Sequence, residues 1–326
     1  MAGVTQESSP IASSQAAAVP GAAGNQKPNA APTGHSHLDS RAVLILVTCC
    51  LLWGLNQVAV KVALPHLPPL LQLALRSGLA LLLVAGWMHW RGVRWRDHQH
   101  TTAAGLLAGS LFAVEFALIF IGLQHTTAAR SVVFINTSPF VVAVLLAWLR
   151  PADRLSLRQI LGLLIAFAAL ASAFREGFGS SGQGASLTGD LLALGGALMW
   201  GLTTVTIRLT SLRSAPFELT LAYQLAVALV FSLIGAAVAG EAWPSQWPTL
   251  VLASVFYQAV IVTFASYLLW FWLLQHYPAT QVQSFVFLSP VFGAGLAGLL
   301  LGEPLTAGLL LALAGVAVGL TLLNRR

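Results

Sequence analysis

Charged side chains inside apolar segments are the residues of this sequence best placed to do chemistry. Glu115 lies within the apolar segment 103–123, and Arg76 lies within the segment 70–88. An ionisable group this deep in an apolar helix is costly and marks a substrate or proton pathway. At about 1.5 Å per residue, Glu115 and Arg76 lie roughly 12 and 9 Å from the same membrane face. The sequence therefore permits an ion pair, which is either structural or is broken by substrate or proton.

Three further cations lie nearer the ends of apolar segments. Arg130 is about 4.5 Å deep, where a long side chain can reach interfacial water. The alternative for Arg130 is a role in an outer gate or in contact with a substrate carboxylate. Lys61 and Arg208 end their segments on opposite faces and are interpreted as interfacial anchors.

Polar and aromatic residues within the apolar segments predict a cavity. Asn56 and Gln57 need partners, because an unsatisfied amide in hydrocarbon is costly, and a water-filled cavity would supply them. Packing between helices is the alternative for the aromatic residues. The candidate cavity residues are Trp53, Asn56, Gln57, Phe112, Glu115, Phe116, Asn136, Trp200, Thr203, Tyr267, Trp270 and Gln283.

The composition places these residues in a membrane protein. Hydrophobic residues make up 57% of the chain, charged residues only 8%, and the mean hydropathy is +0.81. Apolar stretches of about 18 to 25 residues are long enough to cross a bilayer as helices. Ten such segments are predicted, at 42–64, 70–88, 103–123, 127–149, 157–174, 188–207, 217–239, 249–274, 279–300 and 305–323.

Two fragments of the chain occur twice, which indicates an internal duplication. The segment 51–56, Leu-Leu-Trp-Gly-Leu-Asn, returns at 198–203 as Leu-Met-Trp-Gly-Leu-Thr, and Gln124-His125 with Ser138-Pro139 returns as Gln275-His276 with Ser289-Pro290. We expect a disordered cytoplasmic tail at 1–40, a first repeat at 41–176 and a second at 187–324. Matched positions that differ are Glu115 against Ser266, Arg76 against Tyr223, and Asn56 against Thr203.

Basic residues predict that the two repeats are inverted. Five helices per repeat bring the second copy into the membrane from the opposite side. With a cytoplasmic N-terminus, twelve Lys and Arg residues lie on the inner side and two, Lys61 and Arg175, on the outer side. The arginine-rich loops of the first repeat have counterparts that carry Glu241 and Glu303 instead. Inverted repeats are characteristic of secondary transporters with a substrate site near the midplane.

Proline and glycine positions predict how the helices bend and pack. Pro139 and Pro290 lie inside matched segments and are expected to kink them. Gly105/Gly109 and Gly315/Gly319 have the small-xxx-small spacing that lets helices approach closely, within one chain or across a dimer. The oligomeric state therefore stays open between monomer and homodimer.

These motifs together resemble the drug/metabolite transporter superfamily, in its duplicated EamA-type branch. The resemblance covers about residues 42–323 and rests on the Trp-Gly-x-Asn element, Arg76, both Ser-Pro pairs and Gly302-Glu303-Pro304-Leu305. It implies ten helices, both termini cytoplasmic, a central cavity and export or exchange of small metabolites. One departure is the loop 150–154, Arg-Pro-Ala-Asp-Arg, where the family has a Gly-Glu pair.

The sequence lacks the motifs of several classes of protein. There is no Gly-rich phosphate loop ending in Gly-Lys-Ser/Thr, no His-Glu-x-x-His and no Gly-x-Ser-x-Gly. The basic residues lie in short loops, which fits membrane topology better than nucleic-acid binding. The sequence predicts a secondary transporter of the inner or plasma membrane for small solutes, with protons as candidate coupling ions and neither cofactor nor metal. A lipid-handling membrane enzyme and a non-transporting scaffold are the alternatives.

Overall fold

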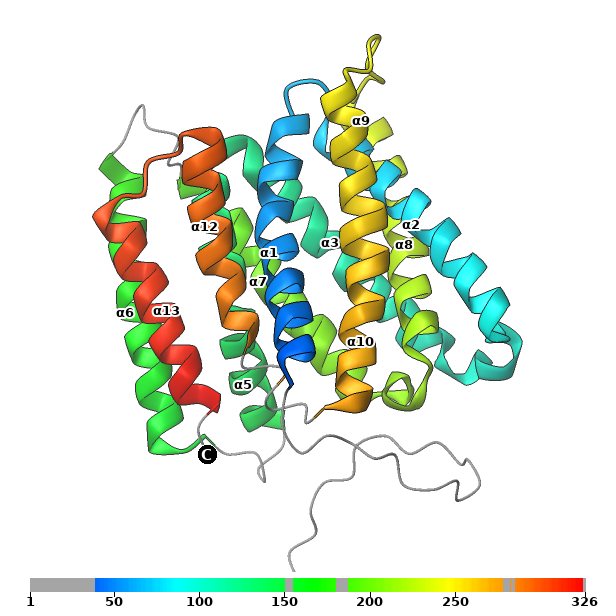
Figure 1. Cartoon of the computed structure of the whole chain (residues 1–326), viewed down its shortest axis with the longest axis horizontal. Helices are drawn as coiled ribbons and strands as arrows, with labels where there is room; N and C mark the ends of the chain where they lie inside the picture. Colours follow the sequence, from blue (N-terminus) through cyan, green and yellow to red (C-terminus); the bar gives the residue numbers. More distant parts are fainter. Residues whose placement is uncertain (1–38, 150–154, 180–186, 278–281, 283–284, 325–326) are drawn as a thin grey trace, which may run out of the picture. The chain divides into compact units, whose positions relative to one another are not determined.

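The computed structural model describes residues 39–149, 155–179, 187–277, 282 and 285–324, and every regular element in these ranges is a helix (Figure 1). The predicted tail, apart from Asp39 and Ser40, and the loop 150–154 lie outside these ranges. In chain order the elements are α1 (Ser40–Ala63), α2 (Pro69–Arg91), η1 (Trp95–Thr101), α3 (Thr102–His125), α4 (Ala128–Ile135), α5 (Ser138–Leu149), α6 (Leu157–Gly179), α7 (Leu187–Leu209), η3 (Ser211–Ser214), α8 (Phe217–Ala239), α9 (Thr249–Phe256), η4 (Tyr257–Ser266), α10 (Tyr267–His276), η5 (Phe285–Phe287), α12 (Leu288–Leu301) and α13 (Ala307–Asn324).

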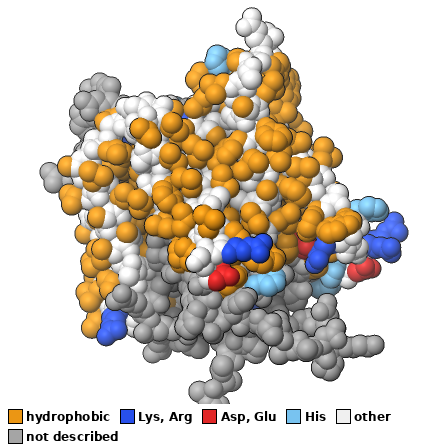
Figure 2. Space-filling model, viewed as in Figure 1, with side chains coloured by type: hydrophobic (Ala, Val, Ile, Leu, Met, Phe, Trp, Pro, Cys, Tyr) orange, Lys and Arg blue, Asp and Glu red, His pale blue; other side chains and the backbone are white. Residues whose placement is uncertain are grey.

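The predicted membrane-spanning class is confirmed. Within the described residues, seven helical segments are long and apolar enough to cross a bilayer, and three shorter apolar helices lie in the fifth, ninth and tenth predicted segments. Hydrophobic side chains cover the visible face of the bundle, and most charged side chains that can be seen gather near its lower edge (Figure 2). Such a surface suits a hydrocarbon solvent.

The two ends of the bundle need names. We call the end at which α1 begins, near Ser40, the mouth end, and the end at which α1 finishes, near Ala63, the latch end. The last described helix, α13, finishes at the mouth end (Figure 1). The described chain therefore enters and leaves the bundle at the same end.

Matched end signals set the register between the second helices of the two repeats. Pro68 precedes α2 and Pro216 precedes α8, and both helices end at a glycine in the left-handed conformation, Gly92 with φ 70° and Gly240 with φ 69°. A left-handed residue after a helix favours glycine, which has no Cβ to clash. This alignment pairs Arg76 with Gln224, one residue from the Tyr223 predicted from the sequence.

The duplicated Trp-Gly and Ser-Pro motifs pack against each other across the repeats. An added Cβ at Gly54 of α1 would lie 2.9 Å from the Ser289 backbone oxygen of α12, and one at Gly201 of α7 would lie 3.5 Å from the Ser138 oxygen of α5. The first helix of each repeat thus contacts the fourth span of the other. This crossed pairing is the packing expected from an inverted duplication.

Replacing Gly54 by alanine is expected to lower the free energy of unfolding by about 1–3 kcal/mol, the usual cost of overpacking. The new Cβ would lie 2.6 Å from the backbone nitrogen of Gly293, which no side-chain rotation can relieve. Thermal unfolding in detergent measures the effect. Gly86→Ala is the matched control, because nothing lies within 4 Å of an added Cβ there. Equal unfolding temperatures for the two variants would contradict the close approach.

The prediction that Pro139 and Pro290 kink continuous helices differs from the structure. The fourth span is divided into α4 and α5, and Pro139 is the second residue of α5. Pro290 is the third residue of α12, which follows the short η5. Proline is tolerated in the first turn of a helix, because the amide hydrogens there have no intrahelical partner. The Ser-Pro pairs therefore begin new helices.

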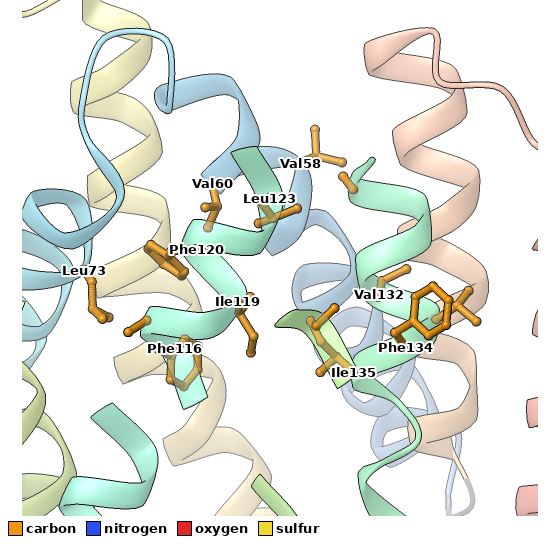
Figure 3. Close-up of a cluster of buried hydrophobic side chains, with 14 of the residues drawn as sticks. Val58, Val60, Leu73, Phe116, Ile119, Phe120, Leu123, Val132, Phe134 and Ile135 are labelled. Atoms are coloured by element: carbon orange, nitrogen blue, oxygen red, sulfur yellow. The ribbon is translucent and has the colours of Figure 1, made fainter. Parts of the chain in front are cut away.

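Small and large apolar side chains form the core. Phe116, Ile119 and Phe120 of α3 pack between α1, α2 and α4, as Figure 3 shows. The two glycine pairs pack within the chain, which is the first of the two alternatives: added Cβ atoms at Gly105 and Gly109 would meet α8, and those at Gly315 and Gly319 would meet α6. Helix α3 thus packs against helices of its own repeat and against α8 of the second repeat.

Candidate functional site

A cavity of about 660 Å³ lies between helices of both repeats. Its lining includes Asn56 of α1, Arg76 of α2, Phe112 of α3, Thr203 of α7 and Gln224 of α8. The structure brings eleven of the twelve sequence-selected cavity residues to this lining: Trp53, Asn56, Gln57, Phe112, Glu115, Phe116, Asn136, Trp200, Thr203, Tyr267 and Trp270. The twelfth, Gln283, lies outside the described residues.

The cavity extends toward the mouth end. Arg208 in the last turn of α7 and Arg213 of η3 are exposed and belong to the lining, as do Ala215 and Phe217 just before and at the start of α8. Arg208, interpreted from the sequence as an interfacial anchor, therefore also lines the cavity. Lys61 is also more than an anchor, because its Nζ donates to the backbone oxygens of Leu123, at 2.9 Å, and Thr126.

Arg76 is the most deeply buried cation of the cavity, with 1% of its surface exposed. Its Nε donates to Thr263 Oγ1 at 3.0 Å, and its guanidinium carbon lies 3.9 Å from the centre of the Phe116 ring. An aromatic face attracts a cation in this position. One edge and one face of the guanidinium are thus held by protein.

Glu115 lines the same cavity and is 4% exposed. The ion pair with Arg76 that the sequence permits does not form as a direct contact: among the described residues, Glu115 Oε2 and Arg76 Nη1 each have no hydrogen-bond partner. An acidic and a basic side chain therefore line one cavity without a direct ion pair between them.

Two amides of the cavity lining have acceptor oxygens without partners in the described part of the chain. Within the described residues, Asn56 Oδ1 and Gln57 Oε1 are buried and unpartnered, whereas the Asn136 amide donates to the Val132 oxygen at 2.7 Å. Buried acceptors of this kind require a polar partner, since a buried acceptor without a hydrogen bond costs free energy. The side chains of Asn56 and Gln57 are thus suited to accept from a ligand or water.

An aromatic wall stands beside these polar groups. The Trp53 ring lies 5.1 Å from that of Trp270, edge to face, and 6.4 Å from that of Tyr267. Trp53 Nε1 donates to Ser266 Oγ at 2.8 Å. This hydrogen bond joins the duplicated tryptophan of α1 to Ser266, the residue that matches Glu115 in the other repeat, and it orients the Trp53 ring.

A polar network closes the latch end. Arg130 donates to both carboxylate oxygens of Asp190 in the first turn of α7, Nε to Oδ1 at 3.1 Å and Nη2 to Oδ2, and Nη2 also donates to the Ala173 oxygen at 2.7 Å. Thr126 Oγ1 donates to Asp190 Oδ1 at 2.8 Å. Arg130 is 3% exposed, so the snorkelling interpretation was wrong. Arg130 does not line the cavity. We call Thr126, Arg130 and Asp190 the latch.

Two carboxylates of the second repeat cap helices of the first repeat at the latch end. Glu303 accepts from the backbone nitrogens of Ala128 and Ala129, at 2.8 and 2.9 Å, at the start of α4. Glu241 accepts from those of Leu70 and Leu71, at 3.2 and 2.9 Å, at the start of α2. A carboxylate at a helix N-terminus satisfies amides and favours the helix dipole. The acidic loops thus bind one repeat to the other.

Glu303→Ala is expected to lower the free energy of unfolding by about 1–2 kcal/mol, the usual value of a capping side chain. The loss arises because two amides at the start of α4 would lose their acceptor. Chemical unfolding in detergent measures it. Glu303→Gln, which keeps an acceptor oxygen without the charge, should lose less. An alanine variant as stable as the wild type would contradict the capping role.

Within the described part of the chain, seven membrane-length helices and three shorter apolar ones are arranged as two inverted repeats around a cavity with polar residues in its lining. This arrangement defines a multi-pass membrane protein with the architecture of secondary transporters. The EamA-like transporter family matches the chain twice, over residues 40–175 and 187–325. The chain therefore belongs to this family, in the drug/metabolite transporter superfamily.

Named relatives agree with this family. The "Uncharacterized transporter YvbV" of Bacillus subtilis is 29% identical over 88% of this chain and 92% of its own. The "Probable amino-acid metabolite efflux pump" of Salmonella typhimurium is 28% identical over 85% of this chain and 92% of its own, and a protein of the same description from Escherichia coli is 25% identical over 81% and 87%. A solved crystal structure covers 87% of this chain and 97% of its own with a TM-score of 0.58 and 20% identity, which shows a shared fold.

Proposed function

We propose that this transporter is a secondary active exporter or exchanger of small organic metabolites, amino-acid-like or drug-like, that works by alternating access. The observation that carries the proposal is the unequal closure of the bundle. The cavity reaches exposed residues at the mouth end, whereas the latch and two helix caps join the repeats at the other end. A cavity of about 660 Å³ falls in the size range of small-molecule sites.

The membrane is the inner or plasma membrane, with both termini cytoplasmic and repeats at 41–176 and 187–324. The twelve-to-two distribution of Lys and Arg supports this orientation. The mouth end then faces the cytoplasm, because Ser40 and Asn324 lie there. Cargo would thus enter the cavity from the cytoplasm in the conformation described here, as an exporter requires.

Glu115 is the coupling residue of this proposal. It is the one acidic side chain of the described cavity lining, and it has a carboxylate oxygen without a partner among the described residues. A buried carboxyl group that exchanges a proton with the cavity can link the proton gradient to cargo release. Arg130 and Asp190 belong to the latch, and their ion pair must break when the latch end opens.

Counterflow in proteoliposomes tests the proposal. Vesicles loaded with one solute from a panel of amino acids, nucleobases and drugs are diluted into a trace of the same labelled solute, with and without a pH gradient. We expect labelled solute to accumulate for at least one member of the panel. Flux of none, with protein that remains folded, would contradict transport, and turnover of a lipid by the same protein would favour the enzyme alternative.

A further inference from the structure

We propose that the cargo carries a carboxylate on an apolar or aromatic body, that Arg76 binds the carboxylate, and that Thr263 positions Arg76. This inference rests on the proposed transport function and narrows its cargo class. It starts from a guanidinium that belongs to the cavity lining and is not fully satisfied, since Arg76 Nη1 is buried and has no partner among the described residues. A carboxylate is the group that matches a guanidinium in geometry and charge.

Protein contacts occupy part of the Arg76 guanidinium. Thr263 takes the Nε hydrogen, and the Phe116 ring covers one face of the guanidinium at 3.9 Å. The side chain is therefore held on two sides, and little conformational entropy remains to be lost when a ligand binds. Preorganisation of this kind increases affinity without adding contacts.

Thr263 owes its place to an irregular segment of the eighth span. The segment η4 is a π-helix from Tyr257 to Ser266, and Thr263 Oγ1 donates to the Gln258 oxygen five residues earlier, at 2.7 Å. π-Helical turns are rare and are often found at functional sites. Because its hydrogen is used on the backbone, the Thr263 oxygen faces Arg76 as an acceptor. Thr263 is therefore a positioning residue.

The charges of the lining favour an anionic cargo with one negative charge. Three arginines, Arg76, Arg208 and Arg213, and one acid, Glu115, belong to the described lining. Exposed arginines at the mouth attract an anion and raise its local concentration. Glu115, deeper in the cavity, would repel a second negative charge, which disfavours a phosphate dianion.

The rest of the cargo meets aromatic side chains. The rings of Phe112 and Phe116 on α3 lie 4.6 Å apart and are tilted, and those of Trp53 and Trp270 lie 5.1 Å apart; all four residues belong to the lining. Aromatic walls contribute large buried area and suit an apolar or aromatic body. The lining thus matches an aryl or alkyl carboxylate better than a sugar or a polyamine.

Three probes with one aromatic body and different head groups test the inference without any variant. Purified protein in detergent is heated with 3-phenylpropionate, 2-phenylethylamine or 3-phenylpropan-1-ol at equal concentration, and binding is measured by calorimetry. We expect 3-phenylpropionate to raise the Tm and to bind about tenfold or more tightly than the alcohol, because a hydrogen bond to a charged group is gained. Equal binding of the three probes, tighter binding of the amine or no binding of the carboxylate would overturn it.

Variants then assign the roles. Arg76→Gln should weaken 3-phenylpropionate about tenfold or more and leave the alcohol unchanged, whereas Arg158→Gln, an exposed arginine outside the lining, should change neither. Thr263→Val should weaken only the carboxylate, and Thr263→Ser, which keeps the hydroxyl, should restore its affinity. A Thr263→Val variant with wild-type affinity would overturn the positioning role.

The outcome is separable from that of the transport proposal. If counterflow occurs with other solutes while 3-phenylpropionate fails to bind, the cargo class is wrong and transport stands. If 3-phenylpropionate binds through Arg76 but no solute of the panel or 3-phenylpropionate itself is moved, the site stands and the transport proposal fails. Both measurements use the full chain.

Discussion

Asp190→Ala is expected to destabilise the protein by about 3–5 kcal/mol, the cost of leaving one member of a buried ion pair without its partner. Arg130 is 3% exposed and directs Nε and Nη2 at this carboxylate, so its charge would remain buried without this counter-ion. Thr126 Oγ1 would also lose its acceptor. The free energy of unfolding in detergent, obtained from denaturant titration, measures this loss.

A double variant separates the ion pair from other effects of the substitution. Arg130→Met combined with Asp190→Leu removes both charges and is expected to recover much of the stability, because no unpaired charge is left buried. Asp97→Ala, which removes an exposed aspartate of η1, is the matched control and should lie within about 0.5 kcal/mol of the wild type. A single Asp190→Ala variant as stable as this control would refute the latch.

Glu115→Gln is expected to abolish the response of transport to a pH gradient while exchange of cargo without a gradient continues. Glutamine keeps the size and hydrogen-bonding oxygen of the side chain but cannot take up or release a proton. Proteoliposomes with an imposed pH gradient measure the initial rate of labelled efflux. In the wild type we expect the gradient to accelerate efflux, and in the variant we expect the rates with and without it to coincide.

The matched control for this experiment is Asp97→Asn, which makes the same chemical change at an exposed position outside the cavity lining. It should retain the acceleration. Full retention of proton-coupled efflux by Glu115→Gln would remove the coupling role of Glu115, yet it would leave alternating access and the carboxylate site untouched. The two variants thus test coupling separately from transport.

The apolar spans and much of the cavity lining could be predicted from the sequence. Membrane helices leave a continuous hydrophobic signal, and Asn56 and Gln57 stand out because amides inside such a signal need partners. The structure places both at one cavity, and their acceptor oxygens are unpartnered among the described residues. The sequence therefore identified Asn56 and Gln57 as cavity residues, but it could not show which residues of other helices lie near them.

Asp190 was missed for a physical reason. An acidic residue in the first turn of a predicted helix normally interacts with the helix dipole near the interface, so it carries no signal of burial. Its partner Arg130 is 60 residues away and belongs to the other repeat. The one available signal was Arg130 itself, since a cation inside an apolar segment requires a partner and Asp190 was expected near the same membrane face.

The register of Arg76 and the role of the Ser-Pro pairs depend on helix ends, which sequence patterns locate least well. Motif spacing matched Arg76 with Tyr223 of the second repeat. The prolines and glycines at the ends of α2 and α8 instead match Arg76 with Gln224. Both Arg76 and Gln224 line the cavity, and Tyr223 instead hydrogen-bonds Trp95 at 2.7 Å. The cavity lining therefore has a cation, Arg76, in the first repeat and an uncharged amide, Gln224, at the matched position of the second.

The helix caps have a consequence for the resting population of conformations. Identical inverted repeats would make the two end states of a transport cycle equal in free energy. Here Glu241 follows the left-handed Gly240, and the residue that follows the matched Gly92 is Val93, whose backbone nitrogen makes the same bond to the helix end. Two carboxylate caps at about 1 kcal/mol each would favour closure of one end by roughly 30-fold. Duplication supplies two interchangeable states, and the two glutamates, together with the latch, favour the one that is closed at the latch end.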